Sequence, residues 1–220
     1  RTLPAAAIAA IAALAVVAAC RAAAPVTVPP SAPATAPAPT PAPSAPGVVT
    51  GTAADVRFMQ HMIAHHAQAM VMTALVAERT RRDELRLLAE RIATSQRDEM
   101  AAMRRWLQER GAAVPAVDTS AQAAHAAQAA HAGHDAHAGM PGMLGADALA
   151  RLAAARGPAF DRLFLDFMIR HHEGALTMVA ELFAAPGAAQ GSEVYRLASD
   201  VDADQRAEIR RMRALLATLP

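Results

Sequence analysis

The chain has 220 residues; its basic residues are all arginine and nearly balance the acidic ones, for a formal charge of +1, and only 3% of its residues are aromatic. A charge this close to zero gives no basis for a nucleic-acid partner or a polybasic membrane patch. Scarce aromatic residues and abundant alanine favour close-packed helices over a β-sheet.

The N-terminal segment, residues 1–19, is an apolar run that follows a lone arginine. It is slightly short of the roughly 20 residues that span a bilayer, so we interpret it as an export signal. The stretch Val17-Ala18-Ala19-Cys20 resembles a bacterial lipobox, which implies cleavage before Cys20 and a lipid on its sulfur. An uncleaved anchor with an incidental thiol is the alternative. With Cys20 lipidated, no cysteine remains for a disulfide or a thiolate site, so soft metal ligands would have to be methionines.

Two low-complexity stretches separate the segments with helical signals. Residues 20–47 are rich in proline and lack hydrophobic periodicity, so we expect an extended spacer behind the lipidated cysteine. Residues 112–145 are rich in His, Met, Ala and Gly and are expected to form a flexible linker. The sequence therefore predicts a first helical hairpin within residues 48–111, and a short helix followed by a second hairpin within residues 146–220.

Capping and stop signals set the expected helices of the first hairpin at about 53–79 and 81–110. Thr52 with Asp55, and Thr80 with Asp83, resemble capping boxes, and Gly111 stands where a helix would stop.

Similar signals divide the later segment. Asp147 is expected to cap a short helix that ends at Gly157, and Pro158 suits the first turn of the next helix, about 158–184. A Pro-Gly pair then breaks the chain before Ser192, which is expected to cap the last helix, about 192–217.

The two segments repeat each other. The first helices align with a shift of 106 positions and the second helices with a shift of 109, so the repeat unit is a helical hairpin. A lone hairpin cannot bury its apolar stripe, whereas two hairpins can close into a four-helix bundle with a core. We therefore predict an all-α fold: a four-helix bundle made of two repeated hairpins, plus a short extra helix.

Methionine and histidine recur at helical spacing in both halves. Positions i, i+4 and i+8 share one face of a helix. One such stripe holds Met62, His66 and Met70 in the first half and Met168, His172 and Leu176 in the second. The neighbouring stripe holds His61, His65 and Met72 in the first half and Phe167, His171 and Met178 in the second. Because leucine and phenylalanine replace ligand residues in the second half, we expect two unequal sites.

These residue types together favour a soft or borderline metal. Copper is the leading candidate, as Cu(I), Cu(II) or both, because Cu(I) accepts methionine sulfur while Mg²⁺ and Ca²⁺ demand oxygen ligands. Outside the cytoplasm a thioether also has the advantage that it does not form disulfides. The alternative is that methionine only fills the core and that the buried histidines are only hydrogen-bonded. Recurrence of the joint pattern in both halves favours metal binding.

The second helix of each hairpin carries a further set at i, i+3 and i+7, which shares one helix face. These positions could orient a histidine from outside the ligand set or complete a site, and polar residues on a solvated face with methionine in the core are an equal alternative. The set consists of Gln96, Glu99 and Met103 in the first half and Gln205, Glu208 and Met212 in the second.

The linker carries a separate tract of potential ligands. A His/Met tract of this kind can collect metal ions with modest affinity and little geometric selectivity, and a spacer of biased composition is the alternative. Its members are His125, His131, His134, His137, Met140 and Met143.

Two pairs of segments carry a family resemblance: MIAHHAQAM with QRDEMAAM, and FDRLFLDFMIRHHEGALTM with QRAEIRRM. They resemble a bacterial family catalogued as domain of unknown function number three hundred and five, which includes the CopM copper-binding proteins. The resemblance covers about residues 53–217 and implies a ferritin-like helical bundle, export, and copper binding or tolerance. Carried over to matching positions, the implied site residues are Met62, His65, His66, Met168, His171 and His172, with Gln96, Glu99, Met103, Gln205, Glu208 and Met212 on the second helices.

These observations predict an exported, lipid-anchored copper-binding protein with no catalytic step, which sequesters copper or hands it on outside the cytoplasm. Its partners are metal ions and, through the lipid, a membrane. A ferritin-like metal-dependent oxidase is one alternative, although no histidine here follows a glutamate at the spacing that di-iron bundles use. A non-metal envelope adaptor, whose His and Met residues are only core, is the other.

Overall fold

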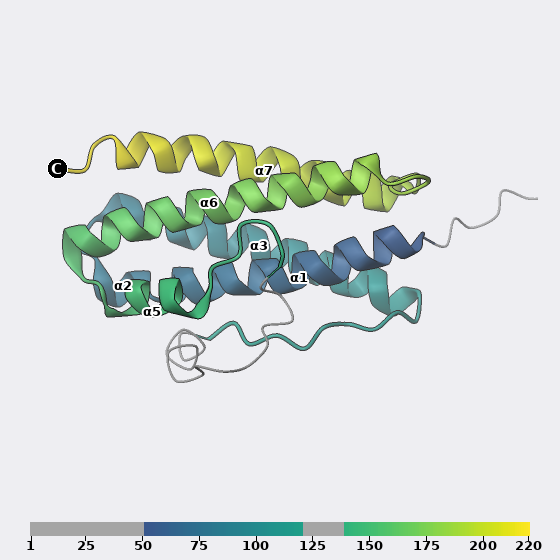
Figure 1. The fold of residues 1–220 in the computed structure, drawn as a ribbon, viewed down its shortest axis with the longest axis horizontal. Helices are drawn as coiled ribbons and strands as arrows, with labels where there is room; N and C mark the ends of the chain where they lie inside the picture. The colour runs from purple at the N-terminus through teal and green to yellow at the C-terminus, as the bar shows by residue number, and fades with distance from the viewer. Residues whose placement is uncertain (1–50, 121–138) are drawn as a thin grey trace, which may run out of the picture. The chain divides into compact units, whose positions relative to one another are not determined.

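The computed structural model describes residues 51–120 and 139–220, and all regular secondary structure in these residues is helical (Figure 1). The predicted export signal, Cys20, the proline-rich spacer and four tract histidines, those at 125, 131, 134 and 137, lie outside the described residues. Within the described residues, no helix is both long and apolar enough to cross a membrane.

Four long helices form the predicted bundle. Helix α1 pairs with α3, α6 pairs with α7, and the two hairpins meet through contacts of α1 with α6 and of α3 with α7 (Figure 1). The one-turn helix α2 connects α1 to α3, and the predicted short helix is α5, which packs on α6. The helices are α1 (Ala53–Ala74), α2 (Val76–Arg79), α3 (Asp83–Glu109), α5 (Ala146–Ala154), α6 (Gly157–Ala184) and α7 (Ser192–Leu216).

The first capping signal is confirmed. The Asp55 backbone N–H donates to the Thr52 hydroxyl at 3.1 Å, and the Thr52 backbone N–H donates to the Asp55 carboxylate at 2.6 Å. The other oxygen of Asp55 accepts from the Ala189 backbone N–H at 2.8 Å. Asp55 is buried, and its carboxylate both caps α1 and holds the turn between α6 and α7 against the start of α1.

Three other capping predictions were wrong in detail. The Thr80 hydroxyl accepts from the backbone N–H of Arg82, two residues ahead, so it forms a local turn and does not cap α3. Gly145 and Gly191, both in extended conformation, precede the first residues of α5 and α7, so neither Asp147 nor Ser192 is the cap. The helix expected over 53–79 is interrupted at Leu75, where α1 ends.

The apolar core of the bundle is divided into two clusters. One cluster takes residues 69–76 at the end of α1 and the start of α2, 85–92 of α3, 160–168 of α6 and 209–212 of α7. The other takes the remaining half of each helix. On each of the four long helices, the boundary between the two clusters falls at the polar residues that the sequence analysis singled out. A buried polar layer therefore crosses the bundle between two apolar halves.

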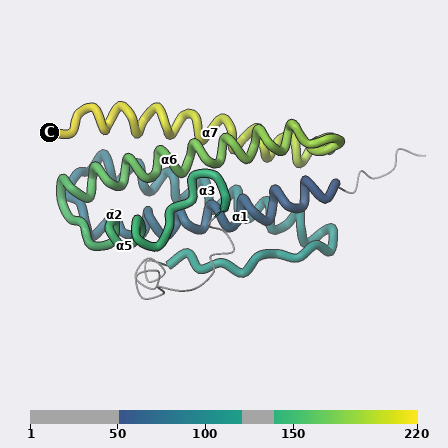
Figure 2. The backbone as a smooth tube through the Cα atoms, viewed as in Figure 1, coloured from purple at the N-terminus to yellow at the C-terminus, as the bar shows by residue number. Residues whose placement is uncertain are grey.

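Two connecting segments lie along the bundle. After α3, the chain runs back beside α1, where the Gln60 side-chain amide donates to the Ala113 carbonyl at 2.8 Å (Figure 2). Residues 139–145, which we call the strap, then cross α6 and lead into α5 (Figure 2). The strap matters for function because it covers part of the polar layer.

Candidate metal centre

The polar layer consists of eight side chains, two from each long helix. All eight are at most 8% exposed, and the four histidines are fully buried. Burying this many polar groups lowers the stability of the fold unless the groups are hydrogen-bonded. Their hydrogen-bond partners therefore show which atoms remain free to bind a ligand. The members are His65 and His66 of α1, Gln96 and Glu99 of α3, His171 and His172 of α6, and Gln205 and Glu208 of α7.

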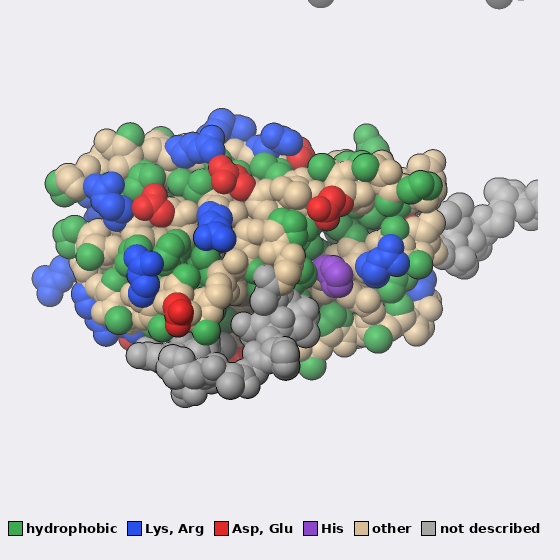
Figure 3. Space-filling view, in the orientation of Figure 1, with side chains coloured by type: hydrophobic (Ala, Val, Ile, Leu, Met, Phe, Trp, Pro, Cys, Tyr) green, Lys and Arg blue, Asp and Glu red, His purple; other side chains and the backbone are tan. Residues whose placement is uncertain are grey.

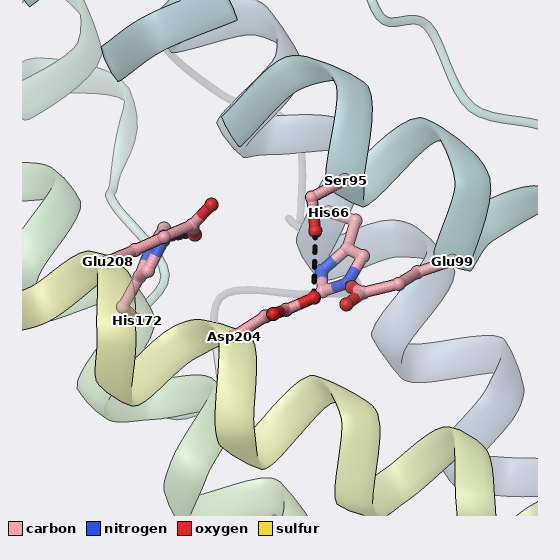
Figure 4. A network of polar contacts seen from close by, with 6 residues as sticks. All are labelled: His66, Ser95, Glu99, His172, Asp204 and Glu208. Atoms are coloured by element: carbon pink, nitrogen blue, oxygen red, sulfur yellow. Dashed lines mark hydrogen bonds and ion pairs between the residues drawn. The ribbon is translucent and has the colours of Figure 1, made fainter. Parts of the chain in front are cut away.

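In each hairpin, one histidine–glutamate pair joins the two long helices. His66 Nε2 lies 2.5 Å from a carboxylate oxygen of Glu99, and His172 Nε2 lies 2.7 Å from a carboxylate oxygen of Glu208 (Figure 4). The two pairs occupy equivalent positions in the repeat. Each glutamate therefore orients one imidazole, the role that the sequence had suggested for residues on the second helix of each hairpin.

The other two histidines meet at the interface between α1 and α6. The ring centroids of His65 and His171 are 3.7 Å apart, and the ring planes are inclined by 34°. His65 Nε2 lies 3.1 Å from the Pro141 carbonyl oxygen of the strap. Since a carbonyl can only accept, Nε2 of His65 must carry the proton.

Burial keeps these two imidazoles neutral. Desolvation, and next the charge of neighbouring His66, lower the pKa of His65 from 6.5 to about 3, despite the opposing effect of the Pro141 carbonyl. Desolvation, followed by the charge of His65, also lowers the pKa of His171 well below its ordinary value. At neutral pH both rings keep a lone pair that no proton competes for.

Every ring of the layer has at least one nitrogen without a hydrogen-bond partner among the described residues. An imidazole that donates Nε2–H to a carboxylate or a carbonyl keeps a lone pair at Nδ1, and metal-binding histidines have this second-ring-nitrogen contact almost always. Nδ1 of His65, His66, His171 and His172 has no hydrogen-bond partner among the described residues. Both nitrogens of His171 are in this state. The layer thus presents several buried, oriented nitrogen donors.

Thioethers lie on both sides of the layer. Met62 and Met103 belong to one apolar cluster, together with Met178. Met168 and Met212 belong to the other cluster, together with Met72. Five of these six side chains are fully buried, and Met178 is 6% exposed. Imidazole nitrogen and thioether sulfur are the ligands that copper prefers in the absence of thiolate.

Side chains of His, Cys, Asp and Glu alone do not complete a centre. Across residues 51–120 and 139–220, no three of these side chains are grouped closely enough to hold one metal ion. A site of three or more ligands in the layer would therefore need a ligand of another kind, and the thioethers are the soft donors nearby.

The remaining predicted residues lie away from the layer. Met70 is half-buried and packs at the edge of one apolar cluster, and His61 is exposed. Phe167 and Leu176, which replace His61 and Met70 in the second half, pack against the other cluster. Met140 and Met143 of the tract are half-buried in the strap. The two halves are thus unequal outside the layer and matched within it.

The sequence did not reveal how the strap is attached. The side-chain amide of Gln68 holds the backbone of Leu144 at both ends, accepting from its N–H at 2.8 Å and donating to its carbonyl at 2.9 Å. On α6, a Cβ added to Gly174 would lie 2.1 Å from the Pro141 carbonyl oxygen, so only glycine admits the strap there. A glycine within a helix that is otherwise rich in large side chains was the available signal.

The sequence of residues 55–216 matches the model of a protein family described as a domain of unknown function, DUF305. The chain belongs to the DUF305 family. No curated protein matches it. The fold and the family resemblance derived from the paired Met and His segments are therefore confirmed.

Solved structures of DUF305 proteins share the fold. A DUF305 fragment from Deinococcus radiodurans is 34% identical, with a TM-score of 0.63, over 77% of this chain and 99% of that one. A DUF305 protein from Streptomyces coelicolor, named as a candidate secreted protein, is 28% identical, with a TM-score of 0.61, over 77% of this chain and 94% of that one. CopM in its Cu(II)-bound form is 28% identical, with a TM-score of 0.57, over 74% of this chain and 95% of that one. CopM structures with Cu(I) and with silver match as well.

Proposed function

We propose that this DUF305 protein binds copper in the polar layer of its bundle and acts outside the cytoplasm, where it sequesters copper or hands it on. The observation that carries the proposal is the set of four buried imidazoles whose Nδ1 atoms lack partners among the described residues. Hydrogen-bonding contacts fix the orientation of each of three rings, His65, His66 and His172, and thioethers lie on both sides of the layer. Related CopM has been crystallised with Cu(I), Cu(II) and silver, which supports a soft ion as the cargo.

The layer fits a binder better than a carboxylate-rich oxidase. Its two glutamates each contact one histidine and do not converge on a shared point with other carboxylates. Di-iron bundles instead gather four glutamates and two histidines around two metals. Binding and release of a soft ion need only the neutral imidazoles and thioethers that the layer supplies. We therefore propose no catalytic step.

The proposed location follows from the N-terminal sequence. The apolar run of residues 1–19 and the lipobox-like stretch before Cys20 support export and a lipid anchor. The relative named as a candidate secreted protein supports export in the same way. Labelling of cells with a lipid precursor, followed by comparison with a Cys20→Ser variant, tests the anchor. Label that is retained in the variant would exclude Cys20 as the attachment point.

A competitive titration tests copper binding. The full chain with Cys20→Ser, which removes the only thiol, is titrated with Cu(I) against a colourless chelator. We expect the double substitution His65→Asn and His171→Asn to weaken the tightest site by about 100-fold or more, because two aligned donors are lost. A milder double substitution, Met62→Leu with Met168→Leu, removes sulfur at nearly constant volume. It should weaken the tightest copper site while leaving the thermal unfolding midpoint nearly unchanged.

A second protein separates the layer from the linker tract. It carries asparagine at the four tract positions 125, 131, 134 and 137, and its layer is unchanged. We expect it to lose weak, unselective copper binding and to keep the tight site. Tight binding that disappears with the tract histidines and survives loss of the layer histidines would overturn the proposal.

A further inference from the structure

A surface recess lies where the strap meets α1 and α6. Its volume is about 500 Å³, and its lining includes three potential metal ligands from three separate parts of the chain: His61 of α1, Met140 of the strap and Met178 of α6. One histidine is visible on the face shown in Figure 3, beside a hollow. Among the described histidines, His61 is the exposed one.

The three side chains differ in exposure in a way that suits capture from solvent. His61 is exposed, Met140 is half-buried and Met178 is 6% exposed. An ion would thus meet an accessible imidazole first and buried sulfur behind it. Met140 and Met178 also belong to the same apolar cluster, so both thioethers lie in one environment. Imidazole and thioether form a donor set for Cu(I) and not for Mg²⁺ or Ca²⁺.

Electrostatic attraction does not account for ion binding in the recess. Its lining includes one cation, Arg57, and one anion, Glu181, whose charges offset each other. A site that gathered ions by electrostatics alone would carry an excess of carboxylates and would weaken in salt. Affinity in this recess must therefore come from nitrogen and sulfur donors.

The recess adjoins the buried layer. His61 precedes His65 by four residues on α1, so the two lie on one face of the helix, one turn apart. Met140 directly precedes Pro141, whose carbonyl oxygen lies 3.1 Å from Nε2 of His65. One residue of the strap thus separates the surface donors from the buried imidazoles.

We propose that His61, Met140 and Met178 form a second, solvent-accessible site that captures Cu(I), or another soft monovalent ion such as Ag(I), on its way to the polar layer. The inference rests on the proposed function for its cargo, but the recess can bind an ion whether or not the layer does. Because Met140 belongs to the strap, displacement of the strap would open the way from this site to His65.

The test uses Ag(I), which is diamagnetic, and methionine methyl groups labelled with carbon-13. The reference protein is the full chain with Cys20→Ser and asparagine at the four tract histidine positions, so that neither the thiol nor the tract competes. Silver nitrate is added in steps to beyond two equivalents, in buffer with and without sodium nitrate. We expect the methyl resonances of Met140 and Met178 to shift in addition to those of Met62 and Met168, equally at both ionic strengths.

A paired variant, His61→Asn with Met140→Leu, removes two of the three donors. We expect it to lose the silver-induced shift of Met178. Uptake of Cu(I) by the layer from a chelator should slow by about tenfold, while the final affinity of the layer stays the same, because the change removes a step on the way in. Met70→Leu is the control, since Met70 of α1 is half-buried, as Met140 is, and lies outside the recess.

The outcomes separate this inference from the proposed function. Methyl resonances of Met140 and Met178 that do not move in the reference protein, or a variant that takes up Cu(I) as fast as the reference, would overturn the recess site. Shifts of Met140 and Met178 without any shift of Met62 or Met168 would support the recess site and contradict copper binding in the layer. Thermal unfolding of each variant shows whether the fold is intact.

Discussion

At the scale of single residues, Glu99 and Glu208 act on the buried histidines through both their contacts and their charge. Each carboxylate lies within hydrogen-bonding distance of Nε2 of one buried histidine, whose opposite nitrogen, Nδ1, is buried without a hydrogen-bond partner among the described residues. A carboxylate in this position also raises the basicity of the imidazole as a ligand. In the proposed copper site, the glutamates therefore act on the metal through the histidines that they hold.

We expect Glu99→Gln to weaken copper binding by about 10- to 100-fold, because an amide can accept the same hydrogen bond but does not enhance the donor strength of the ring. Competitive titration with Cu(I) measures the change. The control is Glu90→Gln, at an exposed position of the same helix, which should leave the affinity unchanged. Equal affinities for the two variants would show that Glu99 has no part in binding.

The low pKa of His65 predicts a pH dependence of stability. In the unfolded chain the ring takes up a proton as the pH falls through about 6.5, whereas in the folded protein it does so only near 3. Between these values the unfolded state binds more protons. The free energy of unfolding of the metal-free protein should therefore fall as the pH falls, by about 1.4 kcal/mol per pH unit for each such histidine.

Urea denaturation between about pH 7 and pH 4.5 measures this slope, a window set by the ordinary histidine pKa. We expect His65→Asn to give a shallower slope than the unsubstituted protein. His61→Asn, at the exposed position, should keep the original slope. A slope that does not respond to the loss of His65 would contradict a neutral buried ring.

At the scale of structural elements, the strap breaks the symmetry of the repeat. Gln68 of α1 and Gly174 of α6 occupy equivalent repeat positions, since each lies three residues after the first histidine of its layer pair, His65 or His171. One binds the strap backbone through its amide, and the other leaves space for Pro141 and Gly142. The strap therefore lies at the interface of the two hairpins, where α1 needs a glutamine and α6 needs a glycine at equivalent positions.

We expect Gly174→Ala to displace the strap, because the added Cβ would meet backbone atoms of Pro141 and Gly142 that cannot move independently of the segment. The cost should be about 1–3 kcal/mol of unfolding free energy, as for other overpacked sites. Amide hydrogen exchange of residues 142–145 should become faster. Gly145→Ala is the control: its Cβ would meet no atom within 4 Å, and its φ of −72° suits alanine. Unchanged exchange in the Gly174 variant would show that the strap is not seated there.

At the scale of the whole bundle, the polar layer trades stability for binding. Both amide atoms of Gln96 and of Gln205 are buried without hydrogen-bond partners among the described residues. A buried polar group in this state costs about 1–3 kcal/mol. An apolar replacement should therefore make the metal-free bundle more stable.

The double substitution Gln96→Met and Gln205→Met tests this trade. Methionine has nearly the volume of glutamine and flexible rotamers, so we expect the unfolding free energy to rise by about 1–3 kcal/mol or more. Thermal and urea denaturation measure it without metal. Exposed Gln108→Met, on the same helix as Gln96, is the control and should have little effect. A lower stability of the double variant would mean that the glutamines are paired within the layer.

The sequence predicted most of the architecture and part of the site. Helix periodicity and the capping box at Thr52 located α1, and the 106-residue repeat predicted that His65 and His171 occupy matching positions. Their contact across α1 and α6, and the pairing of Glu99 with His66, depend on how the hairpins pack. The caps of α5 and α7 were assigned to the wrong residues because extended glycines, Gly145 and Gly191, which have no capping side chain, precede these helices.

The strap could not have been found by the same means. Its sequence is low in complexity and has no periodicity, and its position depends on Gln68 and Gly174, far away in the chain. Such contacts become visible only when the tertiary structure is known.

The equivalence of Gln68 and Gly174 has an evolutionary consequence. Two identical hairpins that associated as separate molecules would present either a pair of glutamines or a pair of glycines at this point. The first pair would block the space that Pro141 occupies, and the second would remove the amide that grips Leu144. A one-sided cover over the histidines thus became attainable only once duplication and fusion had let the two copies diverge.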